Sequence, residues 1–139
     1  MNSKPSLAQI KNDLSELKNF EVAIYGSYAT DVFTSRSDID IAIITREKNP
    51  EKNIKIWKEC LVKAAKLYHI IVFELLPLPV KKNIMDNHIV VFGDKLEISE
   101  YFYHFRKLWE DIKIRYYENQ FSSFREKIEK MKAAIAVKS

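Results

Sequence analysis

The first hundred residues alternate short apolar runs with segments in which apolar residues recur every three or four positions. The apolar runs predict four strands, at 20–25, 38–45, 69–75 and 89–92. The helical spacing predicts helices between them, two of them short, at 5–17, 27–33, 49–68 and 80–87. This order predicts an α+β, or layered α/β, fold in which helices pack on one face of a small mixed sheet that is partly open.

From Glu97 onward the pattern changes to that of one long helix. Its C-terminal half carries apolar residues in alternating steps of three and four, the spacing of a coiled-coil seam: Phe121, Phe124, Ile128, Met131 and Ile135. We therefore expect a core over 1–96 and a helical extension over 97–139, within a single domain overall. The pattern leaves open whether this extension packs on its own core or on a second copy in a homodimer.

The candidate chemistry lies between the first two predicted strands. Gly26 and Ser27 follow the first strand, and Asp38 and Asp40 open the second, with Ser37 directly ahead of them. Glycine allows a ligand to approach the backbone closely, and N–H groups at the start of a short helix bind phosphate. Two carboxylates at positions i and i+2 of a strand point to the same face, and carboxylate oxygens suit Mg²⁺. The motif therefore predicts metal-assisted chemistry on a nucleotide.

Glu74 is the candidate third carboxylate of this site. It falls on the predicted strand 69–75, whose alternation predicts that it lies on the face where Asp38 and Asp40 converge. A third carboxylate there would ligate a metal ion or accept the proton of an attacking hydroxyl. The three histidines, His69, His88 and His104, lack the spacing of metal ligands and are assigned ordinary core or surface roles.

Charge and composition indicate which kinds of partner and which cellular compartment suit this chain. The 139 residues carry a formal net charge of +4 with the signs interspersed, which does not favour nucleic acid as a stable partner. No stretch approaches the roughly 18 apolar residues of a membrane span, and the polar N-terminal segment 1–11 lacks the apolar run of a secretory signal. Cys60 is the single cysteine, so no internal disulfide can form. These features favour the reducing cytoplasm.

Gly26-Ser27, a ten-residue gap that ends in Ser37, and then Asp38-Ile39-Asp40 before an apolar run together resemble the DNA polymerase β-like nucleotidyltransferase superfamily. The layout is most similar to its minimal single-domain members, the MNT proteins, which include the MntA-type antitoxins. The resemblance covers roughly 20–92 and implies the polymerase β-like nucleotidyltransferase fold.

For the site, the resemblance implies that Gly26, Ser27 and Ser37 bind the nucleoside triphosphate, with ATP as the expected nucleotide. It implies that Asp38, Asp40 and, by position, Glu74 hold two divalent ions, Mg²⁺ with Mn²⁺ as the alternative.

The resemblance also implies an acceptor: the AMP would pass to a tyrosine of a HEPN-type toxin. The loop 28–36 departs from the family pattern, since it lacks the usual glycine, and Thr30-Asp31 stands where many minimal members carry a basic residue and a glycine soon after Gly-Ser. Arg36 and Arg46 are the basic residues that could supply positive charge in their place. Two other functions stay open: a weakly active or non-catalytic antitoxin or scaffold that binds its partner through the long helix, and a transferase acting on a small molecule such as an aminoglycoside.

Overall fold

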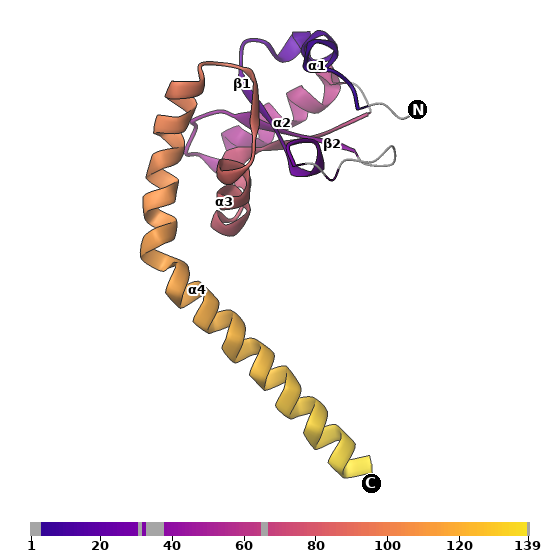
Figure 1. The fold of residues 1–139 in the computed structure, drawn as a ribbon, viewed down its shortest axis with the longest axis vertical. Coiled ribbons are helices and arrows are strands. Elements are labelled where there is room, and N and C mark those ends of the chain that lie inside the picture. Colours follow the sequence, from indigo (N-terminus) through magenta and orange to yellow (C-terminus); the bar gives the residue numbers. More distant parts are fainter. Residues whose placement is uncertain (1–3, 31, 33–37, 65–66, 139) are drawn as a thin grey trace. The chain divides into compact units, whose positions relative to one another are not determined.

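A computed structural model describes residues 4–30, 32, 38–64 and 67–138. The chain divides into two compact units, 1–105 and 106–139, and each is described by itself. The first unit is built on a four-stranded sheet with the order β3-β2-β1-β4 (Figure 1). Its strands are β1 (Glu21–Tyr25), β2 (Ile39–Ile44), β3 (Tyr68–Val72) and β4 (Ile89–Phe92). The predicted small mixed sheet is confirmed, since β1 pairs antiparallel with β2 and β4 while β2 and β3 run parallel.

Four α-helices lie in the described residues: α1 (Leu7–Asp13), α2 (Pro50–Lys63), α3 (Leu78–Asp86) and the long α4 (Lys95–Lys138). Side-chain caps begin α1 and α2: Ser6 accepts a hydrogen bond from the Gln9 amide, and Asn49 accepts from the amides of Glu51 and Lys52. Shorter 3₁₀ turns occupy Ser15–Leu17, Gly26–Tyr28 and Phe73–Leu75. The last of these replaces the end of the predicted strand 69–75, which stops at Val72.

Both faces of the sheet are covered, so the prediction of helices on one face is wrong. On one face Ile39, Ile41 and Ile43 pack with residues of α1 and α2. On the other face Ala42 and Ile44 pack with residues of α3 and of the first turns of α4. A continuously apolar strand must bury both of its faces, because either one left in water would cost free energy.

The strand directions create two distinct ends of the sheet. At one end, the last residue of β1 lies beside the start of β2, with Tyr25 paired to Asp40. Because β3 is parallel to β2, its first residues reach the same end, and His69 pairs with Asp40. The opposite end of the sheet contains the last residues of β2 and β3 and the first residues of β1. We call these the motif end and the far end of the sheet.

None of the helices in the described part of the chain is long and apolar enough to cross a membrane.

Candidate functional site

The Gly26 turn and the Asp40 carboxylate lie directly against each other at the motif end. Gly26 has a backbone φ of +73°, in the left-handed region that favours glycine. A Cβ added there would overlap the Oδ2 atom of Asp40 and lie 3.3 Å from its Cγ. The absence of a side chain at residue 26 therefore allows this carboxylate to approach the backbone of the turn.

The turn itself is held by short local bonds and one long-range anchor. The Ala29 amide donates to the Gly26 carbonyl at 3.1 Å, which closes the 3₁₀ turn. The buried Tyr28 donates its hydroxyl to the Pro5 carbonyl at 2.6 Å, ahead of α1. Lys4 in turn donates to the Tyr28 carbonyl at 2.8 Å. These bonds tie the turn to the segment before α1, so its backbone is positioned before any ligand binds.

The carboxylates at the start of β2 differ in exposure. Asp38 is exposed and precedes the first residue of the strand, whereas the Asp40 side chain is 28% exposed. Tyr25 lies across from Asp40 on β1. Burial, and then the charge of Asp40, raise the pKa of the Tyr25 phenol to about 12. Tyr25 is therefore a neutral hydroxyl beside Asp40 at physiological pH.

His69 is the residue of this end that sequence reasoning missed. Its Nδ1 atom lies 3.0 Å from Asp40 Oδ1, from the neighbouring strand β3. The parallel pairing of β2 and β3 explains this contact, because in that arrangement only the first residues of β3 can reach the start of β2. His69 therefore flanks Asp40 on one side as Tyr25 does on the other.

The donor set of the motif end suits a hard divalent cation that is shared with a phosphate. Among the residues that the structure describes, no three His, Cys, Asp or Glu side chains gather closely enough to hold a metal ion by themselves. Mg²⁺ is commonly bound by one or two carboxylates, with substrate phosphates and water completing its coordination. Asp38 and Asp40 beside a phosphate-compatible turn fit that mode of binding.

Of the basic residues that could supply charge to the site, Arg46 is described and lies elsewhere. Ser37, Asp31 and Arg36 lie outside the described residues. Arg46 lies at the far end of the sheet, where its guanidinium binds both carboxylate oxygens of Glu21, at 2.6 and 3.0 Å. Arg46 therefore supplies no charge to the motif end.

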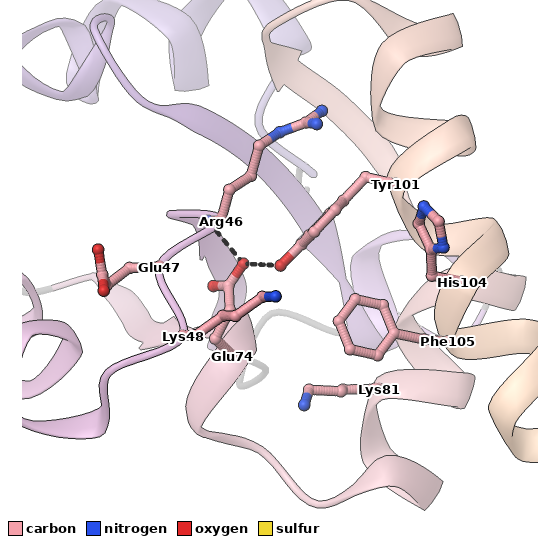
Figure 2. Close-up of a pocket in the computed structure, with 8 residues that line it drawn as sticks. All are labelled: Arg46, Glu47, Lys48, Glu74, Lys81, Tyr101, His104 and Phe105. Atoms are coloured by element: carbon pink, nitrogen blue, oxygen red, sulfur yellow. Dashed lines mark hydrogen bonds between the residues drawn. The ribbon is translucent and has the colours of Figure 1, made fainter.

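Glu74 also lies at the far end, and the prediction that it converges with Asp38 and Asp40 is wrong. Its carboxylate accepts hydrogen bonds from the Arg46 amide at 2.8 Å and from the Tyr101 hydroxyl at 2.6 Å (Figure 2). It also accepts from the amide and the hydroxyl of Thr45, each at 3.1 Å. The physical reason is strand direction. Glu74 follows the last residue of β3, and because β3 runs parallel to β2, Glu74 lies beside the last residues of β2.

Glu74 lines a cavity of about 570 Å³ at this far end, together with Arg46, Tyr101 and Phe105. Figure 2 shows the Glu74 carboxylate between the Arg46 backbone and the Tyr101 hydroxyl. Burial, and then the hydrogen bond to Glu74, raise the pKa of the Tyr101 phenol. Through its hydrogen bonds with Thr45, Arg46 and Tyr101, Glu74 joins the end of β2 to the first turns of α4.

The contacts of Glu74 predict a structural effect for its replacement. In Glu74→Gln the amide nitrogen cannot accept, so the Arg46 amide and the Tyr101 hydroxyl lose a charged acceptor. We expect the free energy of unfolding to fall by about 2 kcal/mol, measured by urea denaturation. The matched control, Glu59→Gln on the exposed surface of α2, should change it by less than about 0.5 kcal/mol. Equal stability of the two variants would contradict the role assigned to Glu74.

Comparisons with known proteins show the family to which the chain belongs. The family model for a nucleotidyltransferase domain matches residues 7–138. A protein of Methanocaldococcus jannaschii named "Putative protein adenylyltransferase" is 48% identical over 111 residues, which are 80% of this chain and 86% of that protein.

Two solved complexes contain chains of similar fold. One holds the tri-AMPylated HEPN toxin of Shewanella oneidensis with an MNT antitoxin, and its match has a TM-score of 0.57 at 9% identity, covering 79% of this chain and 92% of that chain. The other is a toxin–antitoxin complex with AMP-PNP, matched with a TM-score of 0.53 at 13% identity over 75% of this chain and 93% of that chain. At these identities the similarity shows the fold alone. The family match spans almost all of the chain and the archaeal relative shares nearly half of the aligned residues, so this protein belongs to the nucleotidyltransferase domain family.

Proposed function

We propose that the protein is a protein adenylyltransferase that transfers AMP from ATP to a hydroxyl of a partner protein, a HEPN-type toxin, and so acts as an antitoxin. The observation that carries this proposal is the contact between the Gly26 turn and the Asp40 carboxylate. It brings a backbone suited to phosphate and a ligand suited to a divalent cation to one point, as nucleotidyl transfer requires. The cytoplasm, where ATP is abundant, is the proposed location.

The residues of the Gly26-Ser27 and Asp38–Asp40 segments, together with Ser37 and His69, have proposed tasks. The amides of the Gly26–Tyr28 turn and the Ser27 hydroxyl bind the triphosphate, and Ser37 joins them. Asp38 and Asp40 hold two Mg²⁺ ions, with Mn²⁺ as the alternative, which neutralise phosphate charge when bound. His69 orients the Asp40 carboxylate through the contact at 3.0 Å, in the place first assigned to Glu74.

The reaction is a substitution at the α-phosphorus of ATP. The oxygen of the acceptor hydroxyl forms a bond to that phosphorus, while the bond from the phosphorus to the oxygen bridging to the β-phosphate breaks. Pyrophosphate leaves, the hydroxyl proton passes to solvent or a base, and AMP remains on the acceptor. The chain contributes by alignment, since a turn fixed before binding lowers the entropic cost of bringing the reactants together.

The choice of AMP and of a protein acceptor is supported by two comparisons. The archaeal relative is named as a protein adenylyltransferase, and it is similar enough to share a function. The complex with the tri-AMPylated HEPN toxin holds a chain of this fold next to a modified protein. A tyrosine of a HEPN-type toxin is therefore the proposed acceptor.

The test is label transfer from α-³²P-ATP in the presence of Mg²⁺ to a HEPN-type toxin. We expect a labelled toxin band with the unchanged protein and almost no label with Asp38→Asn. Mass spectrometry should find one or more added AMP groups on tyrosine. If the toxin gains no label, or if Asp38→Asn labels it equally well, the protein is not an adenylyltransferase of this type.

A second candidate function is neutralisation of a partner by binding without catalysis. Two observations favour it: the described residues contain no third carboxylate at the motif end, and the second unit exposes an apolar helix face. A growth-rescue assay with the Asp38→Asn and Asp40→Asn variants separates the two functions. Rescue by both variants would assign the function to binding, whereas loss of rescue would assign it to transfer.

A further inference from the structure

The second unit, taken by itself, exposes a long apolar seam on α4, which we call the docking seam. The steps between its members are three and four throughout, and the members are Ile114, Tyr117, Phe121, Phe124, Ile128, Met131 and Ile135. Six of these side chains are between 59% and 67% exposed, and Ile128 is partly exposed. A run of large apolar side chains left in water over three heptads marks an interaction surface.

The spacing of the apolar residues in the docking seam indicates that the partner is a helix. Two apolar positions in every seven make a narrow stripe, which is the geometry of helices that pack side by side in a coiled coil. A helix lying in a membrane surface needs a broader apolar face than this. The seam therefore fits a second helix with apolar residues at the same period.

The residues flanking the docking seam carry charge of mainly one sign. In a coiled coil these are the positions beside the apolar pair, which set partner choice through interhelical ion pairs. Of the seven flanking positions from 113 to 134, four are basic, one is acidic and two are uncharged: Lys113, Glu118, Gln120, Arg125, Lys127, Lys132 and Ala134. The excess of positive charge is concentrated beside Phe121, Phe124 and Met131.

Self-pairing would bring like charges together over that half of the docking seam. A parallel homodimer in register sets Lys127 of one copy opposite Lys132 of the other, since a flanking residue meets the one five positions later, and in the other half it sets Lys113 opposite Glu118. The attractive and the repulsive pair offset each other, so self-pairing gains no net stabilisation from the flanks, whereas a partner with acidic flanks would gain from each of the four basic positions.

We infer that the docking seam binds an amphipathic helix of another protein whose own apolar seam is flanked by acidic residues. Glutamate or aspartate at the facing positions would pair with Arg125, Lys127, Lys132 and Lys113, while its apolar positions would cover the exposed aromatic and aliphatic side chains. The inference describes the partner's chemistry. It does not depend on whether the partner is also an acceptor of AMP.

The test uses the full chain and two designed 21-residue helical peptides with leucine at the seam positions. One peptide carries glutamate and the other lysine at every flanking position. Fluorescence anisotropy at low salt should show the acidic peptide binding at least about tenfold more tightly, and the difference should shrink as salt is added. Transfer activity plays no part in this readout, so its failure and the failure of the proposed function are distinguishable.

A charge-reversal variant keeps the inference falsifiable even if apolar substitutions unfold the helix. Arg125→Glu/Lys127→Glu/Lys132→Glu should retain the helix content seen by circular dichroism and should now prefer the lysine peptide. Equal binding of both peptides to the unchanged protein would overturn the inference. So would sedimentation equilibrium showing a homodimer that Phe124→Ser abolishes, or tighter binding to phosphatidylglycerol vesicles than to the acidic peptide.

Discussion

Replacement of Asp40 by asparagine should lower the rate of AMP transfer by about 1,000-fold, which corresponds to about 4 kcal/mol of lost transition-state stabilisation. Asparagine has the size of aspartate, and its carbonyl oxygen can still accept a hydrogen bond from His69. What it lacks is the negative charge that would bind a divalent cation beside the Gly26 turn. The effect should therefore fall on catalysis and cation binding, while the fold persists.

The measurement is the initial rate of label transfer at saturating ATP and Mg²⁺, with the thermal unfolding midpoint recorded in parallel. The matched control is Asp86→Asn at the end of α3, whose ion pair with Lys82 lies on the surface and contributes little. Asp86→Asn should transfer AMP at the normal rate. Transfer by Asp40→Asn within tenfold of the unchanged protein would exclude Asp40 as a ligand of a required cation.

The motif end could be predicted from the sequence because its geometry is local. Strands joined by a connection of moderate length usually lie side by side, and the Gly26-Ser27 and Asp38–Asp40 segments stand at the two sides of one such connection. Antiparallel pairing then brings the last residues of β1 beside the first residues of β2, with Tyr25 opposite Asp40. Gly26 could be placed near Asp40 once the two strands were identified and taken to be neighbours in the sheet.

The position of Glu74 depended on information that alternation along a strand does not carry. Alternation predicts the face of the sheet on which a side chain lies. The end of the sheet at which it lies depends on whether the strand runs parallel or antiparallel to its neighbour. β3 runs parallel to β2 and joins it through α2, so Glu74 reaches the close of β2, some five residues from Asp40 along the strand. The same pairing brings His69 to Asp40, which the histidine's spacing in the sequence gave no reason to expect.

The second covered face of the sheet was predictable in part. The run Ile39 to Ile44 is apolar at every position but one, and strands buried on both faces have this continuous pattern. The helices that cover the second face are distant in sequence, since Ile84 comes from α3 and Phe102 from α4. Their packing on Ala42 and Ile44 is a tertiary property that no local pattern specifies.

Gly26→Ala should lower AMP transfer by about 100-fold, because it moves the turn and the Asp40 carboxylate apart. An alanine at φ +73° is strained, and its Cβ would overlap Asp40 Oδ2. Relief requires the carboxylate to rotate away or the turn to shift, and a displacement of about 1 Å in a reacting assembly can cost about 100-fold in rate. Label transfer at saturating ATP measures the effect, with the unfolding free energy measured on the same preparation.

The second glycine of the chain supplies the control that separates strain from loss of the site. Gly93 also has positive φ, +117°, and a Cβ there would lie 3.1 Å from Ile98 Cδ1 and 3.3 Å from Glu21 Cγ, at the far end of the sheet. Gly93→Ala should therefore lower the unfolding free energy by a similar amount, about 1–3 kcal/mol, but transfer AMP normally once the folded fraction is taken into account. If both variants lose transfer equally, the loss reflects stability, and the contact between Gly26 and Asp40 has no special part in the reaction. If Gly26→Ala alone loses it, the close approach of backbone and carboxylate is what the reaction requires.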